Sequence, residues 1–407
     1  MKKFNVPVFY KSDLIGKLKE VRKAKDPRKK DYAPSFLDFG PVQFFISRHF
    51  GFCYGVENAI EIAYKAIEEN PSKRIFLLSE MIHNPQVNSD LLSRGVRFIM
   101  DTSGKQLIPW SELNKEDVII LPAFGTTIEI ETKIQSIGID TIKYNTTCPF
   151  VERVWKMSKK LGDGDYTIII HGKAYHEETR ATFSHASKES PSLILRDLKE
   201  AKVLKDIIIG NRPVKDFYTF FEGKYSDGFD AQKDLNRIGV VNQTTMLATE
   251  TSEIASYLKA TMLDKYEEAP VKAHFADTRD SLCYATNDNQ RSTNELLKTG
   301  AHFAIVVGGY NSSNTFNLAT LCQEKFKTYF VSGPENIDLE NNVIHHYDLE
   351  NKLETSTSNF IDWNKEPLKI IITSGASCPD ALVEQIMTNI LKCYKSTKST
   401  TEVMESF

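Results

Sequence analysis

Short apolar runs alternate with longer amphipathic stretches along most of the chain. Six of these runs have four or five residues, the length of a buried strand, and several are rich in isoleucine and valine. A loop of small or polar residues follows each run, and amphipathic helical stretches separate the runs. The predicted strands cover residues 74–78, 117–120, 166–170, 238–241, 304–307 and 369–372. Continuous apolar strands that alternate with helices are typical of parallel sheets covered on both faces, so the pattern predicts an α/β fold.

Polar residues gather where the predicted strands end, and in parallel sheets ligands bind at the carboxyl ends of the strands. The segments 242–245, 311–314 and 374–377 each join a strand to a helix and are rich in Asn, Ser and Thr. Backbone N–H groups and hydroxyls at helix N-termini suit phosphate oxygens. The alternative is that each segment only caps its helix, because Ser and Asn are common caps. His83 and His176 stand in loops of the same kind, although a surface histidine would look the same.

Three cysteines share one local pattern, because Cys53, Cys148 and Cys283 each precede a predicted helix. The helix dipole at such a position favours the thiolate form that a metal requires. The cysteines are separated by 95 and 135 residues, which suggests a repeat of about a hundred residues with an insertion near 211–234. Three similar α/β units that each offer one cysteine would place three thiolates around a shared centre.

Three thiolates could hold zinc or a 4Fe–4S cluster, and unrelated buried cysteines remain the alternative. The chain has no CxxC pair, so zinc fingers and ferredoxin-type clusters lack support. Cys322 and Cys393 occupy apolar helix positions and are predicted to be core thiols. Cys378 precedes a proline, as Cys148 does, so the sequence permits it as a fourth ligand.

A pair of glutamates, Glu177 and Glu178, follows His176. One of them could deliver protons in a reaction that expels hydroxide. The alternative is an exposed glutamate at a helix start, where the helix dipole favours a negative charge.

Composition and charge narrow the classes of partner. The 407 residues suffice for two or three domains, and their net charge of −3 favours neither nucleic acid nor a membrane surface as partner. No apolar run approaches the ~20 residues of a membrane helix, and the N-terminus does not look like a signal peptide. A cytoplasmic protein is expected, and a plastid stroma stays open.

Charge is uneven along the chain. The first thirty residues hold eleven Lys or Arg against three acids, which predicts either a solvated arm or a docking surface for an acidic electron donor. The segment 394–407 has the composition of a disordered tail.

Taken together, the motifs resemble the 4-hydroxy-3-methylbut-2-enyl diphosphate reductase family from about Val42 to Cys393. The resemblance is closest to the plant and cyanobacterial branch, which shares the segments 122–125 and 242–247 and a long N-terminal extension. The matching segments are 51–57, 82–85, 146–149, 171–172, 176–179, 243–245, 283–286, 311–314, 374–377 and 379–380.

This resemblance implies three similar parallel-sheet α/β domains in a pseudo-threefold trefoil around a central 4Fe–4S cluster. Cys53, Cys148 and Cys283 would hold the cluster and leave one iron open. Glu178 would supply protons, helped by Thr244, while Glu177 would face solvent. The residues implied to bind the substrate diphosphate are His83, His176, Thr244, Ser312, Ser313, Asn314 and Ser377.

The reaction implied is the reductive dehydroxylation of an allylic diphosphate to isopentenyl and dimethylallyl diphosphates, the last step of the non-mevalonate isoprenoid pathway. The electrons would come from a ferredoxin or a flavodoxin. One departure concerns Phe124, which stands where many bacterial members have a histidine, and phenylalanine cannot hydrogen-bond phosphate.

The expected domain organisation follows the cysteines. It comprises a basic N-terminal extension (1–41), three α/β domains (42–147, 148–282 and 283–393), and the tail (394–407). Two other functions compete with the reductase. One is a dehydrating three-cysteine cluster enzyme similar to quinolinate synthase, and the other is a non-catalytic redox sensor or electron carrier.

Overall fold

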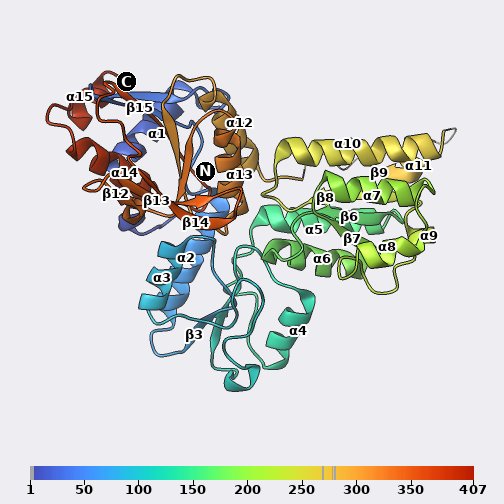
Figure 1. Ribbon diagram of the computed structural model, residues 1–407. Coiled ribbons are helices and arrows are strands. Elements are labelled where there is room, and N and C mark those ends of the chain that lie inside the picture. Colours follow the sequence, from blue (N-terminus) through green and yellow to red (C-terminus); the bar gives the residue numbers. More distant parts are fainter. Residues whose placement is uncertain (1–3, 268–269, 277, 279–280) are drawn as a thin grey trace. The chain divides into compact units, whose positions relative to one another are not determined.

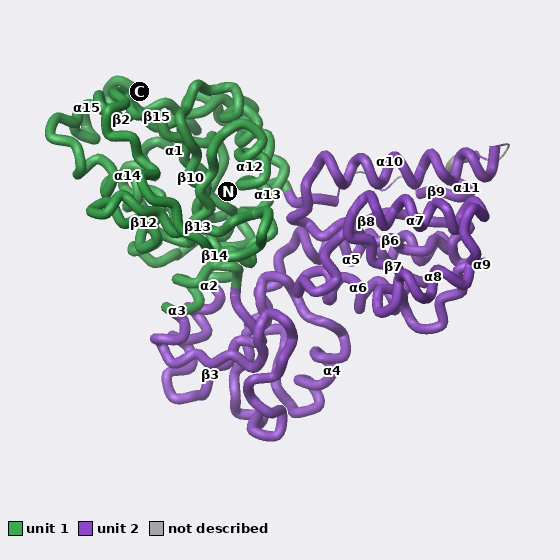
Figure 2. The backbone as a smooth tube through the Cα atoms, viewed as in Figure 1, with its two compact units in different colours: residues 1–61, 82–90, 284–407 green, residues 62–81, 91–283 purple. Residues whose placement is uncertain are grey.

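The computed structural model describes residues 4–267, 270–276, 278 and 281–407 (Figure 1). The chain divides into two compact units (Figure 2). Unit 1 contains residues 1–61, 82–90 and 284–407, and unit 2 contains residues 62–81 and 91–283. Helices α2 (Tyr54–Glu69) and α3 (Pro85–Ser93) each begin in unit 1 and end in unit 2.

Unit 1 is built on one eight-stranded mixed sheet. Its four middle strands, in the order β2, β15, β10 and β11, are parallel to one another, and β1, β12, β13 and β14 pair antiparallel. The strands are β1 (Ser35–Asp38), β2 (Val42–Ile46), β10 (Phe303–Val307), β11 (Thr328–Val331), β12 (Ile337–Asp338), β13 (Val343–Asp348), β14 (Leu353–Ser358) and β15 (Leu368–Ser374).

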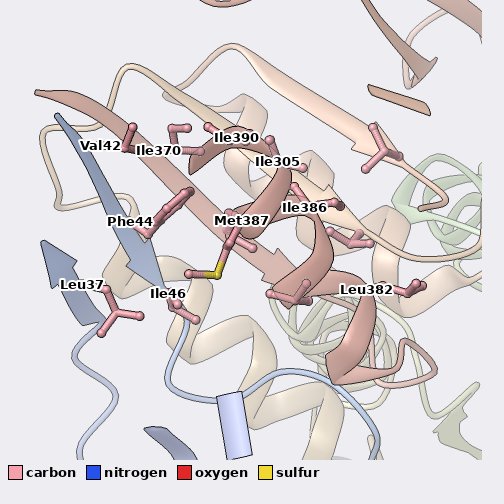
Figure 3. Packing of buried hydrophobic residues seen from close by; sticks show 14 of the residues in the cluster. Leu37, Val42, Phe44, Ile46, Ile305, Ile370, Leu382, Ile386, Met387 and Ile390 are labelled. Carbon is pink, nitrogen blue, oxygen red and sulfur yellow. The ribbon is translucent and has the colours of Figure 1, made fainter. Parts of the chain in front are cut away.

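Helices cover this sheet on both faces. Consecutive strand residues point to opposite faces, so neighbouring residues of one strand pack against different helices. Ile305 and Ile370 pack with α1 (Asp13–Lys25), α14 (Asp380–Lys392) and α15 (Thr400–Glu405), as Figure 3 shows for α14. Their neighbours Ala304 and Ile371 pack instead with α12 (Tyr284–Leu296) and α13 (Ser313–Gln323). Each large side chain buried in this way contributes about 1.5–3 kcal/mol.

Unit 2 contains two smaller, entirely parallel sheets with the strand orders β4-β3-β5 and β7-β6-β8-β9. Two apolar clusters cover the two faces of the four-stranded sheet. The strands are β3 (Ile75–Leu77), β4 (Arg97–Phe98), β5 (Val118–Ile120), β6 (Thr167–His171), β7 (Ser192–Leu195), β8 (Ile238–Asn242) and β9 (Phe275–Ala276). The helices are α4 (Ile128–Ser136), α5 (Pro149–Gly162), α6 (Glu177–Glu189), α7 (Leu198–Ile208), α8 (Lys215–Phe220), α9 (Ala231–Asp234), α10 (Ala248–Lys265) and α11 (Val271–His274).

All six predicted strands are present, as β3, β5, β6, β8, β10 and β15, so the α/β fold class is confirmed. The predicted insertion 211–234 contains α8 and α9 and lies between α7 and β8. Its aromatic residue Phe217 is buried in the core of the four-stranded sheet. None of the helices in the described part of the chain is long and apolar enough to cross a membrane.

The N-terminal extension is not a solvated arm. Helix α1 buries Leu14, Ile15 and Leu18 in the core of unit 1, and β1 pairs with β2. Strand β2, which starts at the predicted domain boundary Val42, pairs in turn with β15. The structure therefore places the first predicted strand of domain 1 in the sheet of the C-terminal segment.

The prediction of a disordered tail was also wrong. Residues 400–405 form helix α15, which Ser399 and Glu402 cap reciprocally. Val403 of this helix is buried in the same core as α1. Met404 and Phe407 pack against the same core, and the capping box satisfies the first N–H groups of the helix.

Candidate active site

All three predicted ligand cysteines stand at the start of a helix. Cys53 directly precedes α2, Cys148 is the N-cap of α5, and Cys283 directly precedes α12. Burial raises the pKa of the Cys53 thiol, and the backbone N–H groups of Val56 and Gly55 partly offset this rise. N–H donors directed at a buried sulfur suit a thiolate ligand, so the environment of Cys53 fits a metal cluster.

The three cysteines are divided between the units, with Cys53 in unit 1 and Cys148 and Cys283 in unit 2. Within the described residues, no group of three His, Cys, Asp or Glu side chains lies close enough together to hold a metal ion. The convergence of Cys53, Cys148 and Cys283 on one cluster therefore stays a prediction.

The other cysteines differ from one another. Cys322 is buried among apolar side chains of α13, which confirms the prediction of a core thiol. Cys393 is exposed, and its prediction as a core thiol was wrong. The apolar face of α14 ends at Ile390, and Cys393 lies just beyond the last residue of the helix.

Cys378 is a core residue of unit 1, and its deep burial raises the pKa of the thiol. A thiol that is held protonated in an apolar core is a poor ligand. We therefore expect Cys378→Ala to keep the visible spectrum of the cluster and full activity, measured at equal protein concentration. Loss of the cluster in this variant would show that a fourth thiolate takes the iron that the substrate needs.

Five of the seven residues predicted to bind diphosphate meet in unit 1, at the carboxyl ends of the adjacent strands β10 and β15. Ser312 caps α13, and Ser313 and Asn314 form the first turn of that helix. The Ser377 hydroxyl donates to the His83 carbonyl at 3.1 Å, and the Ala376 N–H donates to Asn314 Oδ1 at 2.9 Å.

Two glycines let these segments approach closely. A Cβ at Gly309 would lie 2.5 Å from the His83 carbonyl oxygen, and one at Gly375 would lie 1.9 Å from Thr315 Oγ1. Any larger residue would separate the His83 loop or α13 from the strand ends.

The side-chain amide of Asn314 is directed into this cluster of polar groups. Its Nδ2 is buried and has no hydrogen-bond partner among the described residues. A buried donor that lacks a partner costs about 1–3 kcal/mol, and a bound anion would remove that cost. The arrangement of hydroxyls, amide and helix N-terminus is suited to phosphate oxygens.

The remaining predicted site residues, His176, Glu178 and Thr244, meet in unit 2. His176 is the N-cap of α6, and its Nδ1 accepts from the Glu178 N–H at 3.2 Å. The Glu178 carboxyl accepts from the Thr244 N–H at 2.5 Å, and its second oxygen lies 3.0 Å from the Thr244 hydroxyl. Burial raises the pKa of Glu178 to about 7, so this group can both hold and release a proton near neutral pH.

Backbone contacts connect this group to the two cysteines of unit 2. The Cys283 N–H donates to the Thr244 carbonyl at 3.2 Å, and the Cys148 N–H donates to the Ala123 carbonyl at 2.9 Å. The next residue, Phe124, packs its ring edge-to-face against the His176 ring, with 5.7 Å between centroids. Phe124 therefore supports the orientation of His176, although it offers no hydrogen bond of its own to a phosphate.

Glu177 is buried, and the expectation that it faces solvent was wrong. Its carboxyl accepts a hydrogen bond from the Ser79 hydroxyl, and burial raises its pKa to about 8. Sequence reasoning missed this pair, because Ser79 lies 98 residues away and nothing in its local sequence marks it as a partner.

The raised pKa of Glu177 predicts how stability depends on pH. In the unfolded chain the carboxyl loses its proton near pH 4.5, whereas the folded protein keeps it until about pH 8. The folded state therefore binds more protons in this interval, so the free energy of unfolding falls as the pH rises through it. Glu178 contributes in the same direction up to about pH 7.

Glu177→Gln removes one of these titrations. We expect the unfolding free energy of the variant, relative to the unmodified protein, to increase by a few kcal/mol between about pH 5 and pH 8. Denaturant unfolding at several pH values measures this difference. A difference that does not change with pH would show that Glu177 is ionised in the folded protein.

Comparisons with known proteins identify the family of this chain. The model of the LytB protein family matches residues 44–391. A 4-hydroxy-3-methylbut-2-enyl diphosphate reductase from Prochlorococcus marinus (strain NATL1A) is 36% identical over 94% of this chain and 90% of its own. The enzyme of that name from Picosynechococcus sp. is 38% identical over 87% of this chain and 85% of its own.

Solved structures show the same fold. A structure titled as the (E)-4-hydroxy-3-methyl-but-2-enyl diphosphate reductase, the terminal enzyme of the non-mevalonate pathway, covers 85% of this chain and 98% of its own, with a TM-score of 0.51 and 23% identity. The E-1-hydroxy-2-methyl-but-2-enyl-4-diphosphate reductase from Plasmodium falciparum covers 86% of this chain and 88% of its own, with a TM-score of 0.62 and 20% identity. The match of the family model over most of the chain, with curated relatives above 35% identity, shows that this chain belongs to the LytB protein family.

Proposed function

We propose that this chain reduces 4-hydroxy-3-methylbut-2-enyl diphosphate to isopentenyl and dimethylallyl diphosphates. In this reaction the allylic C–O bond breaks, the hydroxyl leaves as water, and a new C–H bond forms. Two electrons and two protons are consumed for each substrate molecule. The curated relatives that bear the name of this activity match this chain over most of their length.

The diphosphate end of the substrate is proposed to bind at the strand ends of unit 1. Ser312, Ser313 and Asn314 would meet its oxygens at the N-terminus of α13, and Ser377 and His83 would complete the pocket. His176 and Thr244 of unit 2 are proposed as further ligands. Such binding would fix the allylic carbon in position for reduction, since correct placement alone removes a large part of a reaction barrier.

The protein residues Cys53, Cys148 and Cys283 are proposed to hold a 4Fe–4S cluster. When bound, the cluster would supply electrons and an iron without a protein ligand that acts as a Lewis acid. One contact supports the proposal. The Tyr54 N–H donates to the Tyr284 hydroxyl at 3.0 Å, and these two residues directly follow Cys53 and Cys283 in the sequence.

Glu178 is proposed as the proton donor, and its environment is the observation that carries the functional proposal. A buried carboxyl with a pKa of about 7, hydrogen-bonded to Thr244, can give up a proton to a poor leaving group at neutral pH. A redox sensor or an electron carrier would need no such acid. The Thr244 hydroxyl can pass the proton from the carboxyl to the substrate oxygen, because it both donates and accepts.

The proposal is tested by anaerobic turnover of the allylic diphosphate with the cluster-loaded protein and a small chemical reductant. We expect both C5 diphosphates as products, and no turnover of the corresponding alcohol without the diphosphate. Equal turnover of the alcohol would contradict the proposed diphosphate pocket, and no reduction of either compound would contradict the proposed reaction.

A further inference from the structure

One cavity of unit 1 lies apart from the proposed diphosphate pocket. It has a volume of about 570 Å³, and its lining includes Cys53 and the preceding residues Arg48 to Phe52. Among the described residues that line it, none is a predicted diphosphate ligand. Cys53 therefore lines a cavity to which the predicted diphosphate ligands do not contribute.

The N-terminal extension forms much of this wall and holds the Cys53 loop. Lys19 Nζ donates to the Phe50 carbonyl at 3.0 Å and to Asp380 at 2.7 and 2.8 Å. This pair covers Gly51, where a Cβ would lie 2.2 Å from Asp380 Oδ1. Tyr10 of the extension packs edge-to-face against the Phe52 ring, with 5.7 Å between centroids.

Basic residues are concentrated in the segment that forms much of the cavity's rim. Residues 11–30 carry nine Lys or Arg against three acids in a chain with a net charge of −3. Three exposed lysines, Lys11, Lys17 and Lys23, line the cavity, together with the exposed acids Asp13 and Glu20. Next to the rim stand two exposed apolar residues, Val8 at 80% and Phe9 at 52% exposure.

The inner wall holds two neighbouring cations, Lys29 and Arg48, together with the acids Glu57, Asp288 and Asp380. Arg48 is buried, and its Nε has no hydrogen-bond partner among the described residues. Burial lowers the pKa of Lys29, and the neighbouring Arg48 lowers it further. Asp380 is paired with Lys19, and Asp26 lies 4.0 Å from the Arg48 guanidinium. A further anionic group from outside would lessen the repulsion between Lys29 and Arg48.

We propose that the basic segment 11–30, with the exposed apolar residues Val8 and Phe9 beside it, is the docking surface for a small acidic electron-carrier protein. The inference rests on the proposed function, because a reductase must receive electrons. Each encounter would oxidise one reduced carrier by one electron, and two encounters would supply the two electrons of one turnover. Docking here places the carrier beside the Cys53 loop, and complementary charge raises the association rate.

The test uses reduced ferredoxin as the carrier and compares two charge-reversal variants of the full, cluster-loaded protein. The first is Lys11→Glu/Lys17→Glu/Lys23→Glu. The matched control is Lys199→Glu/Lys202→Glu/Lys215→Glu, which changes the net charge equally at exposed positions of α7 and α8 in unit 2. A third variant with arginine at 11, 17 and 23 keeps the charge.

We expect the first variant to raise the KM for ferredoxin about tenfold or more, while the control and the arginine variant stay within twofold. The KM of the unmodified protein should also rise with ionic strength, because the screening length shortens from about 30 Å at 0.01 M to about 8 Å at 0.15 M. An unchanged KM in the first variant, or an equal rise in the control, would overturn the proposed surface.

Turnover with a small chemical reductant separates this proposal from the proposed function. All variants should retain it, since a small reductant needs no docking surface. If the unmodified protein fails with the small reductant, the proposed function fails. If only the first variant fails with it, the three lysines maintain the fold or the cluster, and the docking proposal is overturned.

Discussion

Glu178→Gln is expected to lower turnover of the allylic diphosphate by about two orders of magnitude or more, with the cluster and substrate binding retained. The amide keeps the size of the carboxyl and can still hydrogen-bond to Thr244, but it cannot supply a proton. Anaerobic turnover at matched cluster content measures the loss, and substrate binding is measured separately in the absence of reductant.

Glu177→Gln provides the matched control, because it makes the same change at the neighbouring residue. We expect near-normal turnover, since Glu177 is protonated at neutral pH and the amide can replace it as partner of Ser79. Equal activity in the two variants, or a large loss only in Glu177→Gln, would mean that the proton donor is wrongly assigned.

Serine at position 53, 148 or 283 is expected to abolish both the visible absorption of the cluster and turnover. A serine hydroxyl is a poor ligand for an iron–sulfur cluster, which is held by soft thiolates. Iron content, absorption spectrum and turnover of each purified variant measure the effect, and the spectrum and iron content do so without reference to activity.

Cys393→Ser is the matched control, because it makes the same substitution at an exposed cysteine that is not a predicted ligand. This variant is expected to behave like the unmodified protein. If any one of the three predicted ligands can be replaced without loss of iron, the cluster cannot depend on all three cysteines.

The strands and the polar strand ends were predictable from the sequence, because both depend on local pattern. Isoleucine-rich runs such as 369–372 can only be buried, and the loops that follow them carry the chemistry. The helix starts at Cys53, Cys148 and Cys283 were predictable for the same reason.

Apart from Cys393, the features that were predicted wrongly depend on contacts between distant residues. The burial of Glu177 requires Ser79, and the burial of Val403 requires the core that α1 and α14 form. In the N-terminal extension the high charge hid the spacing of Leu14, Ile15 and Leu18, which is that of a helix with one apolar face. Lysines on the opposite face do not prevent such a helix from packing.

The most direct test of the proposed reaction is the electron balance of a single measurement. The cluster-loaded protein is mixed anaerobically with the allylic diphosphate and a limiting amount of chemical reductant, and the products are quantified. The proposed reaction yields one molecule of C5 diphosphate product, isopentenyl and dimethylallyl together, for every two electrons consumed. Consumption of electrons without these products, or conversion of the substrate without consumption of electrons, would contradict it.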